Sequence, residues 1–352
     1  MTAKKNLLRV MPWGDLPRPS QTAQNLAALE PSGVLLVDKP AGVTSHDVVG
    51  AVRRLAGTRK VGHAGTLDPM ATGLLTLGIG AGTRLLTYMS GHDKSYQATI
   101  RFGASTRTDD AEGELILDSL GVRADFEVRQ FDDAMARLTG EIMQRPASVS
   151  AIKVGGERAY ARVRAGEDVI LPERAVTVYR FERCGDPRTA AIYQLGQPIA
   201  PAIDVDVEVS CSAGTYIRAL ARDLGEALGM GAHLVALRRT QVGEFDVAHA
   251  HGVTDLAQMV RTDTPLPLIR LAQAAAQMMT ALRVSDDQAW ALRHGQFVQL
   301  TPEPERYPVA LLWGSPPQLV AIGKERGHLT APAVVFPSDA SSHFAVNADH
   351  RP

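Results

Sequence analysis

One aspartate, Asp68, stands in a stretch of chain suited to present a carboxylate for chemistry. The stretch, residues 62–73, reads G-H-A-G-T-L-D-P-M-A-T-G. A residue before proline is disfavoured in helical conformation, proline suits the first turn of a helix, and glycines let a ligand or another backbone approach closely. The pattern predicts that Asp68 lies on a loop that enters a helix. Its carboxylate either caps that helix or projects freely for acid–base or nucleophilic chemistry.

The strands that must position this loop are visible in the hydrophobic pattern. Residues 203–212, I-D-V-D-V-E-V-S-C-S, alternate apolar and polar side chains without interruption, and residues 96–102 repeat the pattern. Such alternation is typical of a strand with one buried and one wet face. The apolar run at 34–37, followed by proline and glycine, predicts another strand. Strands and helices without strict βαβ alternation favour a mixed α+β domain.

Two helices are predicted next to these strands. Ser45 is expected to cap a helix whose apolar residues recur at helical spacing as far as Leu55. Leucines four residues apart in the segment 220–228 predict a second helix, which Gly229 ends.

Composition divides the chain into five predicted segments. The first 32 residues hold four prolines without sustained periodicity, which is typical of a mobile leader. Short apolar runs separated by Pro and Gly near the other end predict a small β-rich domain, which a capping box at 285–288 opens. The predicted segments are a mobile leader (1–32), a large main domain that carries Asp68 (33–250), a linker helix region (251–284), a β-rich C-terminal domain (285–337) and a disordered tail (338–352).

Bulk composition excludes several classes of protein. The 352 residues, 45% of them hydrophobic, suffice for a large core and a smaller second one. No run approaches the roughly 18 apolar residues of a membrane span, and the N-terminus lacks the apolar core of a secretory signal. Only two cysteines occur, which argues against a disulfide framework. We therefore expect a cytoplasmic protein with no membrane association.

The balance of charge restricts how a nucleic acid would be bound. The net charge is -1, so any RNA surface must be a local basic patch. Residues 53–60, R-R-L-A-G-T-R-K, carry four positive charges and no acid, and Arg238 and Arg239 form a second cluster. Each cluster is either a solvated face or a set of phosphate contacts.

The stretch around Asp68 closely resembles the catalytic-aspartate motif of the bacterial tRNA pseudouridine-55 synthases, the TruB family of pseudouridine synthases. Further stretches resemble family motifs in the same order, and together they cover roughly residues 33–245. These stretches are V-D-K-P-A-G-V-T-S (37–45), K-S-Y (94–96), T-R-T-D-D-A-E-G (106–113), G-T-Y-I-R (214–218) and G-A-H-L-V-A-L-R-R (231–239).

The resemblance implies an α+β fold with a mainly antiparallel sheet, an active cleft across its middle, and a PUA-like C-terminal domain. The segment 141–170 looks like the RNA-gripping insertion of the family. Within it, residues 146–151 read P-A-S-V-S-A, where the family commonly has Pro-Pro-x-Tyr/Phe-Ser-Ala. The aromatic side chain of that motif is therefore missing from this chain.

The resemblance also implies catalytic roles. Asp68 would be the essential carboxylate at the sugar, and Tyr216 would accept the C5 proton, directly or through water. Arg218 is the expected partner of Asp68, because a nearby guanidinium keeps an aspartate ionised and orients it through paired hydrogen bonds. Tyr216 and Arg218 are two residues apart, so on an extended segment they would project to one side.

Five further residues form the predicted substrate-binding set. By resemblance, Tyr96 would stack on the uracil, His63 would contact displaced nucleotides, and Leu237 would line the floor of the pocket; splayed RNA bases are commonly bound by such stacking. Lys39 and Arg238 complete the set. The residue patterns alone also allow Tyr96 and Leu237 to be core residues, and His63 to serve packing only.

The implied reaction isomerises uridine to pseudouridine at position 55, in the T arm of tRNA. The base is flipped out of its stack, the N1–C1′ bond breaks, the uracil turns, and C5 joins C1′. This sequence of steps has no redox step and no transfer to a second molecule, so we expect no cofactor and no metal. We expect tRNA as the partner of a monomer that needs no other protein.

Two alternatives come from different classes. The chain could be an RNA-binding or chaperone module with an idle site. It could also be a glycosidase that uses Asp68 with Asp110, because such enzymes need two carboxylates at a defined separation.

Overall fold

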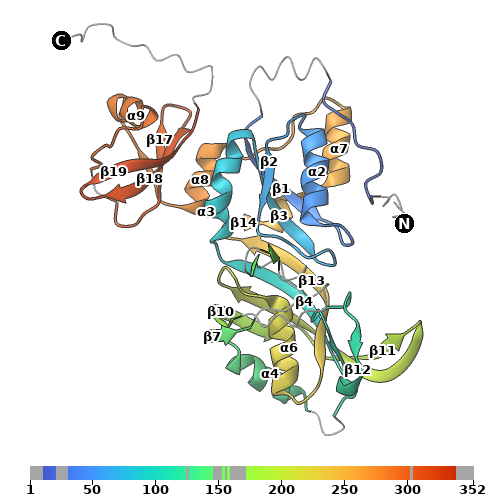
Figure 1. Ribbon diagram of the computed structural model, residues 1–352. Helices are drawn as coiled ribbons and strands as arrows, with labels where there is room; N and C mark the ends of the chain where they lie inside the picture. The colour runs from blue at the N-terminus through green and yellow to red at the C-terminus, as the bar shows by residue number, and fades with distance from the viewer. Residues whose placement is uncertain are drawn as a thin grey trace, which may run out of the picture.

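The protein is built from a large sheet and a small sheet with helices packed against and between them (Figure 1). The computed structural model describes residues 11–20, 31–123, 127–145, 153–154, 157–158, 172–301 and 304–337. The strands of the large sheet are β1 (Gly33–Lys39), β2 (Val61–Ala64), β3 (Thr72–Ile79), β4 (Lys94–Phe102), β7 (Gly140–Gln144), β10 (Arg174–Arg183), β11 (Arg188–Gln194), β12 (Gln197–Cys211), β13 (Ala232–Val242), β14 (Phe245–Asp246) and β15 (His251–Gly252).

The remaining elements are helices, a small sheet and short hairpins. The small sheet consists of β16 (Ala281–Arg283), β17 (Val309–Trp313), β18 (Gln318–Arg326) and β19 (Leu329–Val335). The α-helices are α2 (Ser45–Leu55), α3 (Leu86–Ser90), α4 (Val128–Arg137), α6 (Ile217–Ala227), α7 (Val253–Arg261), α8 (Leu271–Met278) and α9 (Asp286–Arg293). The short elements are the hairpins β5 (Ser105–Thr106) with β6 (Leu115–Ile116) and β8 (Lys153–Val154) with β9 (Glu157–Arg158), and the 3₁₀ turns η1 (Gly80–Leu85), η2 (Leu117–Ser119) and η3 (Val247–His249).

The large sheet is mainly antiparallel. Its strands follow the order β15-β1-β3-β13-β4-β12-β10-β7, and only the pairs β1–β15 and β3–β13 are parallel. The predicted mixed α+β fold is therefore confirmed. The two stretches with alternating polarity are neighbours, since β4 pairs with β12 from Lys94 opposite Cys211 to Phe102 opposite Ile203.

The main core lies on the apolar face shared by β4, β12 and β13. Helices α6 and α4 lie beside this part of the sheet (Figure 1), where the Phe102 and Phe131 rings pack at 4.7 Å between centroids. Leu220 and Leu224 on α6 are fully buried. Helices α2 and α7 pack together at the other end of the sheet, beside β1. The helix predicted from the leucines of 220–228 is thus present, with Gly229 after it at φ +66°.

The start of α2 differs from the expected serine cap. Thr44 is the cap: its hydroxyl accepts from Asp47 N at 3.1 Å, and Thr44 N donates to the Asp47 carboxylate at 2.7 Å. Ser45 is instead the first helical residue and is buried. Its hydroxyl accepts from Leu67 N at 2.9 Å and donates to Leu67 O at 3.2 Å, so it ties the helix to the residue before Asp68.

Part of the predicted mobile leader is anchored. Trp13 and Leu16 are each only 9% exposed and belong to the main core. The Arg54 side chain donates to Leu16 O, and Arg261 donates to Asp15 O at 3.0 Å. Two apolar side chains thus fix residues 11–20, and the expectation of mobility is wrong for them.

Other predicted segments lie outside the described residues. These are residues 1–10 and 21–30 of the leader, most of the proposed insertion 141–170 with its altered 146–151 stretch, and the tail 338–352.

The C-terminal part contains the predicted small β domain. Ser285 N donates to Gln288 Oε1 at 2.9 Å and Gln288 N donates to Ser285 Oγ at 3.2 Å, which confirms the capping box, and Gly295 follows the end of α9 at φ +77°. Helices α7 and α8 lie in the segment expected to link the domains. Within the described ranges, no helix has both the length and the hydrophobicity that crossing a membrane requires.

Gly73 fixes the approach of β3 to β13 and gives a test of the fold. Its φ is +96°, and a Cβ atom there would lie 2.3 Å from Arg239 O. Gly73→Ala should lower the free energy of unfolding, measured by urea denaturation, by about 2 kcal/mol or more, because the backbone must shift.

Gly50 is the matched control for this substitution. It lies inside α2 with nothing within 4 Å of an added Cβ. Gly50→Ala should raise stability by about 0.5–1 kcal/mol, because alanine favours helix. Wild-type stability of Gly73→Ala would contradict the close contact of β3 with β13.

Candidate active site

Asp68 lies on the loop between β2 and β3. Asp68 O accepts from Ala71 N at 3.1 Å, and β3 begins at Thr72. The expectation that this loop enters a helix is wrong, because the turn closed at Ala71 leads directly into a strand. Asp68 therefore caps no helix. Its side chain is 35% exposed, so the carboxylate is available to a ligand.

Buried polar groups hold this loop on both sides of Asp68. The hydroxyl of Ser45 holds Leu67, as described above. Lys39 Nζ donates to Val43 O at 2.7 Å, Pro40 O at 3.0 Å and Pro69 O at 3.2 Å. Lys39 was predicted to bind substrate, but it is 0% exposed and its ammonium is directed to carbonyl groups. It therefore positions the Asp68 loop instead of contacting a ligand.

Burial has a large effect on the Lys39 ammonium. Desolvation lowers the pKa of Lys39 to about 8, although the negative charge of Asp68 raises it in part. Arg239 is a second buried cation at this loop. It is 1% exposed, and it donates from Nε to Leu74 O at 2.8 Å and from Nη2 to Gly65 O at 3.0 Å. The interpretation of Arg239 as part of a surface cluster is therefore wrong.

The predicted partner of Asp68 is in contact with it. Arg218 Nε lies 3.0 Å from Asp68 Oδ2, and Nη2 donates to Oδ1 at 3.3 Å, so the guanidinium binds both carboxylate oxygens. Arg218 is 8% exposed. The expected extended segment is absent, because Tyr216 is the cap of α6 and Arg218 lies in its first turn.

Arg218 also binds a second, buried carboxylate. Its Nη1 lies 3.2 Å from Asp110 Oδ2 and 3.0 Å from Thr108 O. The other oxygen of Asp110 accepts from the Thr108 hydroxyl at 2.5 Å and from Glu112 N at 3.1 Å. Asp110 is 3% exposed. A glycosidase would need this carboxylate at the sugar, but here it orients Arg218 from the buried side.

A neighbouring ion pair was missed by the sequence analysis. Arg222 Nη1 lies 3.0 Å from Asp109, and Arg222 also binds Asp223 at 2.7 Å and Arg145 O at 2.8 Å. The spacing in the sequence could have indicated this ion pair, because Arg222 is four residues after Arg218 and therefore lies on the same face of α6. Burial raises the pKa of Asp109 to about 6, although Arg222 opposes this change.

The residues predicted to bind the base lie on several elements. Tyr96 on β4 is 8% exposed and belongs to the main core; burial raises its pKa, and Arg239 opposes that rise. Leu237 on β13 is 6% exposed and, with Arg238, lines a cavity of about 560 Å³ that also borders Met70 and Thr72. Arg238 forms a paired ion bridge with Asp38 at 2.7 and 2.9 Å.

Tyr216 and His63 make contacts outside the Asp68–Arg218 pair. The Tyr216 backbone is fixed by Gln144, through Tyr216 N to Oε1 at 2.8 Å and Nε2 to Tyr216 O at 3.0 Å. The Arg174 guanidinium lies over the Tyr216 ring at 5.6 Å. The His63 ring meets His46 edge-on at 5.5 Å, and burial lowers the pKa of His63, which favours its neutral form.

Comparison with protein families identifies similar proteins along most of the chain. The family model described as TruB family pseudouridylate synthase (N terminal domain) matches residues 53–217, and the tRNA pseudouridylate synthase B C-terminal domain matches residues 218–273. A relative from Cutibacterium acnes, named tRNA pseudouridine synthase B, is 53% identical over 300 residues, covering 85% of this chain and 92% of its own. A relative of the same name from Leifsonia xyli subsp. xyli is 50% identical over 312 residues, which cover 88% of this chain and 97% of the relative.

Solved structures share the fold at low sequence identity. A chain in the crystal structure of a Cbf5-Nop10-Gar1 complex superposes with a TM-score of 0.63 at 24% identity, covering 91% of this chain and 89% of its own. A chain in the structure of an H/ACA RNP bound to a substrate RNA containing 2'-deoxyuridine has a TM-score of 0.60 at 23% identity. The match covers 94% of this chain and 93% of that chain. These two likenesses extend over the large sheet and the C-terminal domain.

The raised pKa of Asp109 gives a pH test of the network behind Arg218. A carboxyl group whose pKa is about 6 when folded, against about 3.8 when unfolded, stabilises the fold below pH 4, and this contribution is lost as the pH rises through 6. Asp109→Asn removes the titration. Between pH 4 and 7.5, the stability of the variant relative to wild type should therefore rise by up to about 3 kcal/mol.

Urea denaturation at several pH values measures this difference. Asparagine tolerates the φ of +60° at this position. The exposed Asp118→Asn substitution is the control and should show no such trend. A pH-independent stability difference for Asp109→Asn would contradict the raised pKa.

Proposed function

The chain belongs to the TruB family of pseudouridylate synthases, and on this premise we propose that it converts uridine 55 in the T arm of tRNA to pseudouridine, with Asp68 as the essential carboxylate. The observation that carries the proposal is the two-oxygen ion pair between Asp68 and Arg218, at 3.0 and 3.3 Å, on a partly exposed loop. An idle RNA-binding site would have no need of a carboxylate fixed in this way.

The ion pair prepares Asp68 for chemistry at the sugar. Two hydrogen bonds from the nearly buried Arg218 guanidinium fix the direction of the Asp68 carboxylate. Asp68 either adds to C1′ or removes the C2′ proton. Both routes release uracil with the electron pair of the N1–C1′ bond, and the uracil then turns so that C5 bonds to C1′. In the first route, this new bond displaces the Asp68 carboxylate from C1′. In the second route, C5 adds to the C1′=C2′ double bond and the proton held by Asp68 returns to C2′. The C5 proton is lost, N1 gains a proton, and no electrons enter or leave.

The remaining site residues act on the flipped base. Tyr216, whose backbone is held by Gln144, accepts the C5 proton directly or through water. Tyr96, which is 8% exposed, stacks on the uracil, and Leu237 borders the base. Neutral His63 contacts the displaced nucleotides. Stacking of this kind offsets the cost of removing a base from its neighbours, which is on the order of a few kcal/mol.

The proposal extends to the partner, the setting and the division of the chain. The protein acts on tRNA in the cytoplasm as a monomer, with no obligate protein partner. The catalytic domain covers 33–250, the linker helix region 251–284 and the C-terminal domain 285–337. The two separate sheets support a division into two domains, because no strand pairing joins them within the described residues. The linker region as proposed includes the edge strand of each sheet, β15 and β16.

Removing the charge of Asp68 tests the central role. Asp68→Asn should lower turnover at least about 10³-fold, because an amide keeps the shape but acts neither as base nor as nucleophile. Affinity for tRNA should stay within a few-fold of wild type. Tritium release from 5-tritiated uridine in an unmodified tRNA transcript measures turnover.

The exposed Asp118→Asn substitution is the control for this experiment and should release tritium at the wild-type rate. Turnover by Asp68→Asn within ten-fold of wild type would refute the role of Asp68. Absence of tritium release by the wild-type protein would favour the idle-site alternative.

Tyr96 tests the stacking role against packing. Tyr96→Phe keeps the aromatic face and should retain most activity. Tyr96→Leu should lower kcat/KM about 10- to 100-fold, since stacking on one base contributes roughly 1–3 kcal/mol. Because Tyr96 is nearly buried, the leucine variant should also lose about 1–2 kcal/mol of stability.

Phe102→Leu, on the same face of β4 and fully buried, is the matched control. It should lose stability but keep its activity per folded molecule. Equal behaviour of Tyr96→Leu and Phe102→Leu in tritium release and melting temperature would show that Tyr96 only packs the core.

A further inference from the structure

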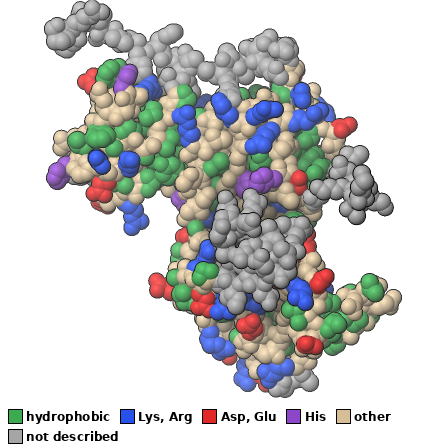
Figure 2. Space-filling view, in the orientation of Figure 1, with side chains coloured by type: hydrophobic (Ala, Val, Ile, Leu, Met, Phe, Trp, Pro, Cys, Tyr) green, Lys and Arg blue, Asp and Glu red, His purple; other side chains and the backbone are tan. Residues whose placement is uncertain are grey.

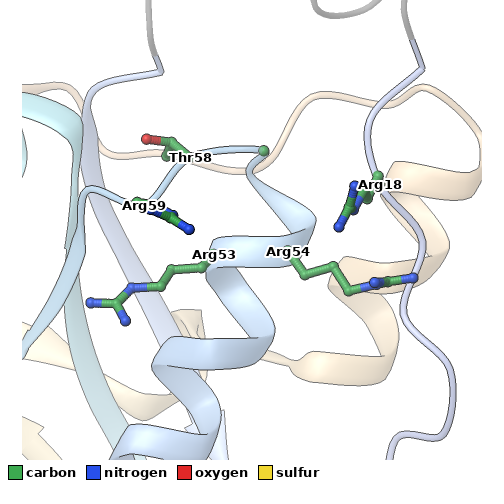
Figure 3. A pocket seen from close by; sticks show the side chains of 6 residues that line it. Arg18, Arg53, Arg54, Thr58 and Arg59 are labelled. Carbon is green, nitrogen blue, oxygen red and sulfur yellow. The ribbon is translucent and has the colours of Figure 1, made fainter.

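A second concentration of positive charge lies away from the Asp68 loop. Arg18, Arg53, Arg54 and Arg59 line one cavity of about 690 Å³, together with Gly57 and Thr58 (Figure 3). In this view Arg18 and Arg59 extend toward one another above the end of α2. Figure 2 shows Lys and Arg side chains gathered over this upper part of the molecule, where Figure 1 places α2 and β2. We call the cavity lined by Arg18, Arg53, Arg54 and Arg59 the arginine pocket.

Two of the four arginines have a structural explanation. Arg53 and Arg54 lie in the last turn of α2, where a cation interacts favourably with the helix dipole. Arg53 Nη2 donates to Val61 O at 3.0 Å, and Arg54 Nε donates to Leu16 O. Each of these contacts uses one nitrogen of the guanidinium and leaves further donors for a ligand.

The other two arginines have no such explanation. Arg18 and Arg59 are exposed, and within the part of the chain that the structure describes neither has a carboxylate or carbonyl partner. Arg18 comes from the N-terminal segment, which Trp13 and Leu16 fix against the core. A single charged run would be explained as a solvated face, but two separate segments converge here on one cavity.

An anion with several acceptor oxygens fits this arrangement. The planar guanidinium donates in pairs to phosphate, and arginine is the residue most suited to such bidentate contacts. Four cations line one cavity, and none of its described lining residues is acidic, so the cations repel one another until an anion neutralises them. The chemistry of the pocket therefore selects a phosphate group.

The position of the pocket relates it to the proposed reaction. Arg59 precedes β2, and the Asp68 loop follows the other end of that strand. Four residues of strand span roughly 13 Å, so the pocket is separated from Asp68 by about the length of β2 plus its flanking turns. An RNA whose base occupies the Asp68 site would extend its backbone over such a distance.

We infer that the arginine pocket holds a backbone phosphate of the tRNA substrate, and that the N-terminal segment supplies Arg18 to complete it. This inference rests on the proposed function for the identity of the RNA. The contact is remote from the reacting atoms, so it contributes to affinity and leaves the chemical step unchanged.

The test removes only Arg18 and Arg59, the two arginines for which the described residues show no carboxylate or carbonyl partner. Arg18→Ser/Arg59→Ser should bind unmodified tRNA transcript about 10-fold more weakly at 0.15 M salt, and the slope of log Kd against log salt should fall by about 1–2. Binding is measured by anisotropy in the Asp68→Asn background, so that turnover does not interfere. In the otherwise wild-type background, KM should rise and kcat should not change.

Arg129→Ser/Arg137→Ser on α4 is the matched control. It removes two exposed arginines and should leave the salt slope as in the parent. Melting temperatures verify that each variant is folded. Unchanged affinity and slope in Arg18→Ser/Arg59→Ser would overturn the inference.

Titration with inorganic phosphate separates a second source of the anion. Suppose that millimolar phosphate raises the melting temperature of the parent but not of Arg18→Ser/Arg59→Ser, and that both proteins bind tRNA equally well. The pocket would then bind free phosphate, and the inference would be overturned. Failure of the proposed function is distinguishable, because a wild-type protein without tritium release could still show arginine-dependent binding of tRNA.

Discussion

The guanidinium of Arg218 lies between the carboxylates of Asp68 and Asp110, and this arrangement requires three separate parts of the chain to meet. Helix α6 supplies the cation, the loop between β2 and β3 supplies the exposed acid, and the turn after β5 supplies the buried one. Breaking a buried ion pair by removing one partner commonly costs about 3–5 kcal/mol. The buried acid therefore secures Arg218 independently of ligand, and Arg218 in turn holds the carboxylate proposed for catalysis.

The Asp68 loop has no regular secondary structure, so its shape depends on side chains that reach it from elsewhere. Lys39 and Arg239 are buried cations, yet their donors are directed mainly to backbone carbonyls, including those of Pro69 and Gly65. Such contacts fix the backbone on both sides of Asp68, while Arg218 makes the two-oxygen ion pair with its carboxylate. A site in which dipoles and donors are positioned before substrate arrives has no reorganisation to complete during the reaction.

Most local elements and the pairing of Asp68 with Arg218 could be predicted from the sequence, and the burial of Lys39 and Arg239 could not. Strict alternation identified β4 and β12, and leucine spacing identified α6, because burial of one face imposes those periods. The continuation after Pro69 was predicted as helix, since proline suits both a first helical turn and a tight turn. Lys39 was predicted to bind substrate and Arg239 to belong to a basic cluster, and charged residues rarely lie fully buried. Their burial depends on carbonyl acceptors that only the assembled fold brings into reach.

Two sets of arginines in this protein have opposite surroundings. Arg218 and Arg239 are almost fully buried, and their donors are directed to carboxylates and carbonyls of the protein itself. The arginines of the arginine pocket are exposed, and Arg18 reaches it only because Trp13 and Leu16 fix the N-terminal segment. A net charge of -1 is compatible with RNA binding on this basis, because the cations that organise the site are paired within the protein, while the arginine pocket gathers four exposed cations around one cavity.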